Sequence, residues 1–131
     1  LLAGYTNESK PIAELYILNS RDNFVPRKAV TGFECIGVPY IAEYLLNRLY
    51  DPEIRTEAGE ELSVLCIQET EDQDASVGGP TRVYCFSSKK DFKEVSATDV
   101  KKLKVKNEKF QIRQKSRFYP EDPSSGSDNL V

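Results

Sequence analysis

The sequence contains no histidine, no methionine and no tryptophan, and its three cysteines stand far apart. Histidine is the commonest general base in enzymes and the commonest zinc ligand, so its absence removes the usual starting point for both kinds of site. Cys35, Cys66 and Cys85 form no C-x-x-C pair, and each lies inside an apolar run, as buried free cysteines usually do. We therefore expect no metal, no cofactor and no nucleophilic cysteine.

Long apolar segments and catalytic motifs are also missing. No apolar run approaches the roughly 20 residues that a membrane-spanning helix needs, so we expect no membrane partner. Carboxylates cluster in residues 69–74, but an exposed loop of like charge does not desolvate one carboxyl group as acid–base catalysis requires. No Lys-Ser or Lys-Thr follows Gly78 and Gly79, as a phosphate-binding loop would need. The sequence therefore indicates a protein that is not an enzyme and binds no small-molecule substrate.

The chain's 131 residues are enough for one domain, which should bury roughly two thirds of its unfolded surface. We expect a single domain over residues 1–118. Residues 119–131 are rich in proline, serine and acidic side chains and predict a disordered tail. The odd number of cysteines, with no visible signal segment, favours an intracellular protein.

Apolar patterning predicts a small α+β fold. Strands are expected over residues 12–19, 29–36, 62–68, 81–87, 92–95 and 109–114. Residues 39–50 predict the one main helix, with Leu45 and Leu46 anchored in the core. Ser96 and Asp99 have the spacing of an N-cap that opens a short helix or a 3-10 turn. We expect a strongly bent sheet or open barrel of five to six strands, in which residues 62–68 and 81–87 form a hairpin.

The net charge of −3 conceals two halves of opposite sign. Residues 1–79 hold 14 acidic and 6 basic side chains, whereas residues 80–131 hold 12 basic and 7 acidic ones. The basic half can attract phosphate or acidic protein, or it can be neutralised by the acidic half. Both alternatives stay open at this point.

The basic charge is densest in residues 101–117, which the alternating pattern predicts to be a basic C-terminal strand. Its cations are Lys101, Lys102, Lys104, Lys106, Lys109, Arg113, Lys115 and Arg117. Aromatic side chains interleave with them, a composition typical of proteins that follow a phosphate backbone and stack on bases. We therefore predict an intracellular binding module, nuclear rather than cytoplasmic and associated with chromatin or nucleic acid. The alternative is a protein–protein adaptor that docks an acidic protein surface.

Residues 81–103 resemble the C-terminal hairpin of tudor-like domains, and of PWWP domains in particular. The shared features are a strand ending in aromatics, a tight polar turn, an aromatic-centred strand and a capped turn. The resemblance implies an aromatic cage for a methylated lysine of a modified histone tail, formed by Tyr84, Phe86 and Phe92. A second interpretation rests on order alone: the expected strands 12–19 and 29–36, the helix and strand 62–68 follow the ββαβ order of ubiquitin-like domains.

Overall fold

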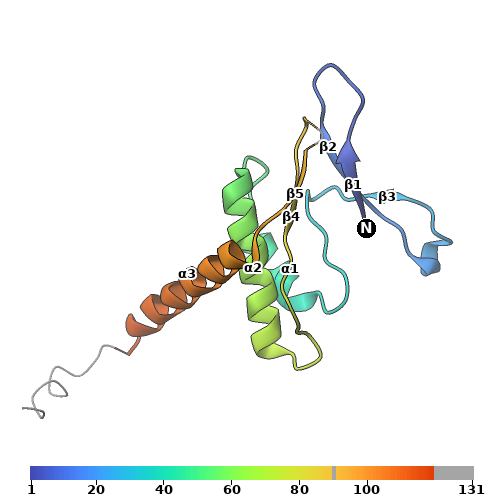
Figure 1. Ribbon diagram of the computed structural model, residues 1–131. Coiled ribbons are helices and arrows are strands. Elements are labelled where there is room, and N and C mark those ends of the chain that lie inside the picture. The colour runs from blue at the N-terminus through green and yellow to red at the C-terminus, as the bar shows by residue number, and fades with distance from the viewer. Residues whose placement is uncertain (90, 120–131) are drawn as a thin grey trace, which may run out of the picture.

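The computed structural model describes residues 1–89 and 91–119 and shows a mixed α+β chain, as expected (Figure 1). Its elements are β1 (Leu2–Tyr5), β2 (Ala13–Ile17), the 3-10 turn η1 (Ser20–Asp22), β3 (Arg27–Lys28), α1 (Tyr40–Leu49), α2 (Thr56–Gln73), β4 (Tyr84–Phe86), β5 (Phe92–Glu94) and α3 (Ala97–Ser116). The described part of the chain therefore has three helices rather than one main helix. Residues 120–131 of the predicted tail lie outside the described residues.

The five strands are divided between two antiparallel sheets. β1, β2 and β3 form one sheet in that order, with Leu2 opposite Tyr16, and β4 pairs with β5, with Phe86 opposite Phe92. The predicted strands 12–19, 81–87 and 92–95 are confirmed as β2, β4 and β5. Within the described residues the two sheets do not close into a barrel.

Helix α1 confirms the prediction for residues 39–50. Pro39 occupies the N-cap, and the helix ends at Leu49, just before Asp51 and Pro52, because the residue before a proline is pushed out of helical geometry. No residue of α1 is fully buried, however. Leu45 and Leu46 are only half-buried, so the expectation that they anchor the helix deep in the core is wrong.

The strand predicted over residues 62–68 is wrong, because this segment lies within the 18-residue helix α2. Every second residue from Leu62 to Thr70 is buried, which on a helix means that two opposite faces are covered. The Cys66 thiol lies against the backbone of α1, while Val64 packs in the core with α3. The apolar segment that predicted a strand therefore belongs to a helix that is buried on both sides. The hairpin with residues 81–87 is also wrong, since β4 pairs with β5.

The strand predicted over residues 29–36 is wrong as well. Only Arg27–Lys28 pairs with β2, and the residues that follow are irregular. Gly32 has a φ of +83°, which a strand does not accommodate, and Val30 is 93% exposed. With this strand and strand 62–68 both absent, the ββαβ order of a ubiquitin-like domain is not what the chain adopts.

The basic strand predicted over residues 101–117, including strand 109–114, is instead the 20-residue helix α3. Ser96 caps this helix as predicted, because its hydroxyl oxygen accepts a hydrogen bond from the Asp99 backbone N–H at 3.1 Å. The cap opens a long helix rather than a short turn. Lysine and glutamine are good helix formers, and the apparent alternation of Phe110 and Ile112 places both on the exposed surface of the helix.

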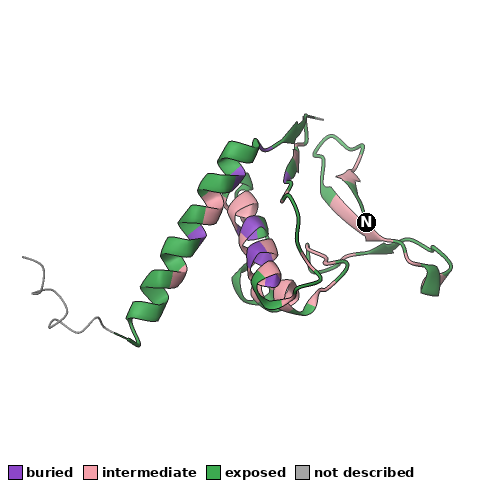
Figure 2. Ribbon diagram, turned by 60° about the horizontal axis from the view of Figure 1, so that its bottom comes forward, coloured by how far each residue is buried: buried purple, intermediate pink, exposed green. Residues whose placement is uncertain are grey.

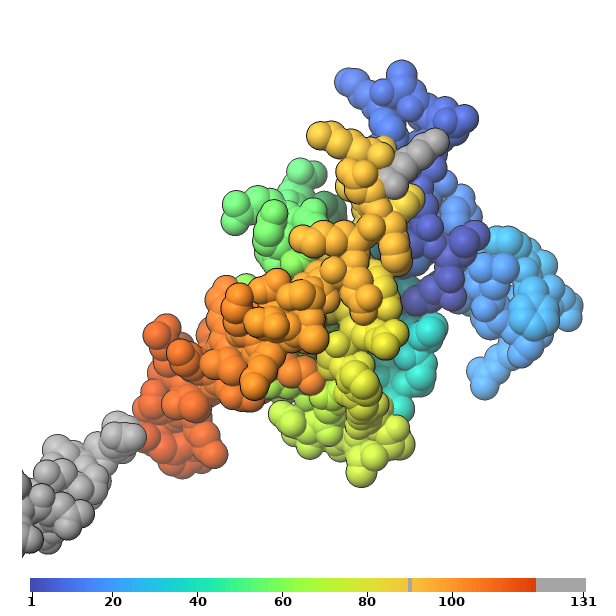
Figure 3. All heavy atoms as spheres, in the orientation of Figure 1, coloured from blue at the N-terminus to red at the C-terminus, as the bar shows by residue number. Residues whose placement is uncertain are grey.

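The core is small and lies where α2 meets the start of α3 and the base of the β4–β5 hairpin. It consists of Val64, Val83, Val95 and Val100, with Cys85 and Leu103 packed against it. Burial is concentrated along α2 (Figure 2). The β1–β2–β3 sheet and the end of α3 lie at opposite ends of the molecule (Figures 1 and 3). None of the described helices is both long enough and apolar enough to span a membrane.

Candidate functional site

The helical form of residues 97–116 arranges the predicted cations in a new way. Five of them follow one another at spacings of four, three, four and four residues, which places them on one stripe along α3. We define this cationic stripe as Lys102, Lys106, Lys109, Arg113 and Arg117. All five are exposed, and the stripe extends over about 22 Å at 1.5 Å per residue.

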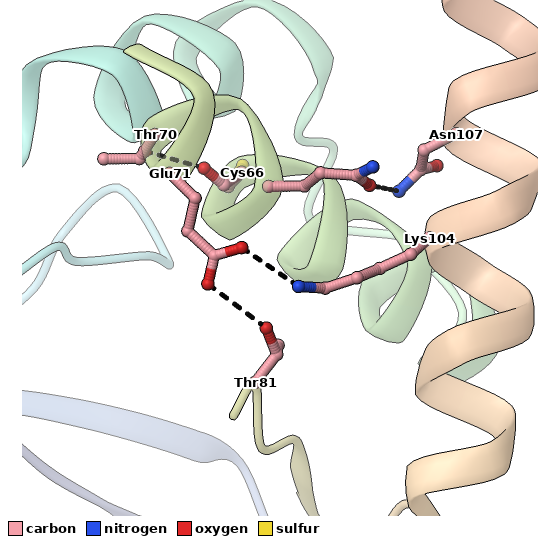
Figure 4. Close-up of polar contacts among 7 residues, drawn as sticks. Cys66, Thr70, Glu71, Thr81, Lys104 and Asn107 are labelled. Atoms are coloured by element: carbon pink, nitrogen blue, oxygen red, sulfur yellow. Dashed lines mark hydrogen bonds and ion pairs between the residues drawn. The ribbon is translucent and has the colours of Figure 1, made fainter. Parts of the chain in front are cut away.

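The other three predicted cations lie off the stripe. Lys101 and Lys115 are exposed on other parts of the helix surface. Lys104 is only 28% exposed and turns toward α2, where its Nζ donates to the Glu71 carboxylate at 3.0 Å (Figure 4). The structure therefore brings five of the eight residues together and assigns Lys104 to the packing of α3 on α2.

The acidic half of the chain neutralises the basic segment only in part. Besides Lys104, Lys106 pairs with Glu61 of α2 at 2.5 Å, and Lys102 pairs with Asp99 of its own helix at 2.9 Å. Lys109, Arg113 and Arg117 form no ion pair with any residue that the structure describes. Three cations of the stripe are thus available to a ligand.

Polar contacts between α2 and α3 fix which side of α3 faces solvent. The Asn107 amide donates to the Gln68 side-chain carbonyl at 3.4 Å, and both residues are buried (Figure 4). One turn further along, the Gln111 amide donates to Glu69. Because buried polar groups need such partners, these contacts hold α3 in one rotation against α2 and leave the cations of the stripe exposed.

Helices α1, α2 and α3 together border an open groove of about 820 Å³. Its apolar lining consists of Leu45, Leu49, Ile54, Leu62, Leu65 and Phe110. Its cations are Arg48, Lys106, Lys109 and Arg113. The two carboxylates that also line it, Glu61 and Glu69, already contact Lys106 and Gln111. The groove therefore has an apolar lining and carries more cations than carboxylates, although the net charge of the whole chain is −3.

The sequence interpretation found the cations of this groove but missed its apolar part. It expected Leu45 to be anchored in the core, whereas Leu45 and Leu49 line an open surface. The cations are three or four residues apart in the sequence, which is the spacing of residues on one side of an α-helix. That spacing was the signal that could have identified both the helix and the stripe.

The three predicted cage residues share one exposed face of the β4–β5 hairpin. The rings of Tyr84 and Phe92 stack on each other, with centroids 5.3 Å apart and an interplanar angle of 12°. The ring of Phe86 instead packs against the ring of Tyr5 in β1, with centroids 5.6 Å apart. The Tyr5 hydroxyl donates a hydrogen bond to the Phe86 carbonyl oxygen at 3.2 Å. Tyr84 and Phe92 therefore cover each other and offer a cation only their outer faces, and Tyr5 adds a fourth ring.

The surroundings of Cys35, Cys66 and Cys85 raise the pKa of each thiol. Burial raises the pKa of Cys66 to about 11. Burial, followed by the hydrogen bond that the thiol donates to Glu60 at 2.9 Å, raises the pKa of Cys85 to about 11 as well. Among the described residues, no three His, Cys, Asp or Glu side chains cluster as metal ligands would.

Comparisons with family models, with curated proteins and with solved structures found no match for this chain. We therefore infer function from the chemistry of the groove and the cationic stripe.

Proposed function

We propose that this chain is a non-enzymatic binding module that docks an acidic, amphipathic helix of a partner protein in the groove between α1, α2 and α3. The observation that carries this proposal is the position of Lys109 and Arg113 beside an open apolar surface formed by Leu45, Leu49 and Phe110. Apolar residues of a bound helix at positions i, i+4 and i+7 would cover that surface. Acidic residues on the flanks of the bound helix would meet the cations.

An apolar lining favours protein over nucleic acid as the ligand. Phosphate contacts need cations but gain nothing from Leu45, Leu49 and Leu65, whose burial by a partner helix is favourable at about 25 cal/mol per Å². Two of the five stripe cations, Lys102 and Lys106, are already paired within the chain.

Nucleic acid or a modified histone tail in chromatin is the second candidate. It is favoured by the linear arrangement of Lys109, Arg113 and Arg117 beside the exposed ring of Phe110, which suits phosphate contacts and base stacking. The resemblance of residues 81–103 to tudor-like and PWWP hairpins supports the same candidate, with Tyr84, Phe86 and Phe92 as the cage. This candidate function implies a nuclear location.

Fluorescence anisotropy titrations distinguish the two candidates. The first probe is a labelled helical peptide with leucines at i, i+4 and i+7 and glutamates on the flanks, and the second is a short DNA duplex. The double variant Lys109→Glu and Arg113→Glu should weaken peptide binding by at least about tenfold, which corresponds to about 1.4 kcal/mol.

The matched control is the double variant Lys101→Glu and Lys115→Glu, which makes the same charge change on α3 outside the groove. It should change peptide affinity by less than about twofold. Equal losses in the two double variants, or no measurable peptide binding, would contradict the proposal. Tighter binding of the duplex than of the peptide, lost equally in both double variants, would establish the nucleic-acid candidate instead.

A further inference from the structure

Ser116 lies at the end of the cationic stripe, in surroundings that no other serine or threonine of the chain shares. Arg113 precedes it by three residues, Lys115 comes directly before it and Arg117 directly after it. No other serine or threonine of the sequence has an arginine three residues before it. Protein kinases select hydroxyl groups by the charge pattern around them, because a complementary kinase surface attracts those charges. Ser116 therefore has the charge pattern of a substrate for a kinase that recognises basic residues.

Ser116 is also accessible to a kinase. It is the last residue of α3, its side chain is exposed, and the end of this helix extends beyond α2 (Figures 1 and 2). Its hydroxyl donates to the Arg113 carbonyl oxygen at 2.9 Å, within the same helix. Within α3, all of which the structure describes, no residue after Asn107 is buried. The last turn can therefore open at little cost, as exposed helix ends do.

The helical period places Ser116 beside cations that border the groove. Ser116 follows Arg113 by three residues and Lys109 by seven, which are the spacings of residues on one side of a helix. The residue four positions before Ser116 is Ile112, so Arg113 is the cation within reach on the preceding turn. Arg113 and Lys109 line the groove, and neither forms an ion pair with a residue that the structure describes. A phosphate on Ser116 would therefore meet an unpaired guanidinium.

We propose that Ser116 is a phosphorylation site and that its phosphate binds Arg113, which lowers the affinity of the groove for acidic partners. The effect on affinity rests on the proposed function, whereas the modification itself does not. In the transfer, a bond forms between the Ser116 oxygen and the γ-phosphorus of ATP. The bond from that phosphorus to the bridging oxygen breaks, ADP leaves, and the hydroxyl proton passes to the carboxylate base of the kinase.

The phosphate changes the charge of the groove in two ways. A phosphoserine carries about −1.5 to −2 charges at pH 7 and can accept two parallel hydrogen bonds from one guanidinium, which withdraws Arg113 from a partner's carboxylates. Lys106 is already paired with Glu61. Arg48 and Lys109 then remain as the groove cations without an ion pair among the described residues. The rest of the phosphate charge repels acidic side chains of the partner from this end of the groove.

Mass spectrometry tests the modification itself. The full chain is incubated with ATP and a kinase that recognises an arginine three residues before serine. We expect phosphate on Ser116 and none on the variant Ser116→Ala. Arg113→Gln should slow the transfer by at least about tenfold, whereas Arg21→Gln, which removes an exposed arginine outside α3, should leave the rate unchanged. No phosphate on Ser116, or equal phosphate on other serines, would overturn the proposal.

Phosphorus NMR tests the contact with Arg113 without any peptide. A guanidinium stabilises the dianionic phosphate and lowers its second pKa, which is about 6 in phosphoserine. We expect a lower pKa in the phosphorylated wild type than in Arg113→Gln that has been phosphorylated to completion by longer incubation. Lys115 and Arg117 are present in both proteins and affect both values alike. Equal pKa values would overturn the assignment of Arg113 as the partner of the phosphate.

Anisotropy titration with the acidic amphipathic peptide tests the effect on the groove. The phosphorylated chain should bind at least about tenfold more weakly than the unmodified chain. Kinase-treated Ser116→Ala is the control and should bind as the unmodified chain does. Equal affinities of the two forms for a peptide that binds would overturn the effect on affinity alone. No binding to the unmodified chain would contradict the proposed function and this effect together, while mass spectrometry and phosphorus NMR still decide the modification and its contact.

Discussion

Gly32 has a backbone conformation that side-chain-bearing residues rarely adopt, with a φ of +83°. A Cβ atom at this position would come within 2.5 Å of the Tyr50 hydroxyl oxygen. The ring of Tyr50 cannot move away freely, because Phe33 packs edge-on against it at 5.3 Å. These contacts hold the loop before α1 against Tyr50, which is the C-cap residue of α1. They thereby position α1, which forms one wall of the groove.

Gly32→Ala should therefore destabilise the fold by about 1–2 kcal/mol, or more if Tyr50 has to move. Urea unfolding followed by circular dichroism measures this change. Gly59→Ala is the control, because Gly59 lies in α2 with open space around its Cα. There alanine should stabilise the protein by up to about 1 kcal/mol. Equal effects at the two positions would show that Gly32 is under no special constraint.

At the scale of the elements, the sequence predicted those whose apolar pattern faces one side only. Helix α1 has one apolar stripe between Pro39 and Pro52, and Leu15 and Ile17 of β2 share one face of the strand, so both elements were predicted. Helix α2 was missed because two of its faces are buried, which places Leu62 and Cys66 opposite Val64 and Gln68.

Helix α3 was missed for a different reason, and the candidate site was missed with it. Its contacts with α2 are largely polar, through residues such as Lys104, Asn107 and Gln111, so no apolar stripe marks its buried side. The cations of the site could be predicted individually. Their 4-3-4-4 spacing could have predicted the stripe, but its position beside an apolar groove could not be predicted, because it depends on how α1, α2 and α3 pack on one another.

Val64→Ala tests the assignment of residues 62–68 to a helix packed in the core. Val64 is fully buried between α3 and the base of the hairpin, so its truncation should cost about 2 kcal/mol in unfolding free energy. Val105→Ala makes the same change on α3 at a residue that is 40% exposed. It should cost less than about 0.5 kcal/mol, since alanine also favours the helix. A large loss at Val105 together with a small one at Val64 would contradict the packing described here.

The cap of α3 should make stability depend on pH. The Lys102 ammonium, and after it the hydrogen bond with Ser96, lower the pKa of Asp99 in the folded state. A lowered folded pKa means that this stabilisation is present above the unfolded pKa, near 3.9, and is lost as the pH falls through the folded pKa.

Asp99→Asn should therefore be less stable than the wild type at pH 7 and should lose less stability on acidification below about pH 4. Urea unfolding at pH 7, 4 and 3 measures the difference. Parallel stability curves for the two proteins would show that Asp99 does not contribute. Other carboxylates with lowered pKa values, Glu14 and Asp74, are unchanged in both proteins and affect both curves alike.

At the scale of the whole molecule, two surfaces of different chemistry lie apart. The groove between α1, α2 and α3 is apolar and cationic, and the β4–β5 hairpin exposes the aromatic rings of Tyr84, Phe86 and Phe92. The small valine core lies between them, where α2 meets the hairpin and the start of α3.

The most direct test of the proposed groove is to map a bound peptide by NMR. An isotope-labelled chain is titrated with the acidic amphipathic peptide, and amide shifts are followed residue by residue. We predict the largest changes at Leu45, Leu49, Leu65, Phe110 and Arg113, which line the groove on three different helices. Changes confined to the outer surface of α3, at Lys102, Val105 and Ile112, or to the aromatic face of the hairpin would contradict the account.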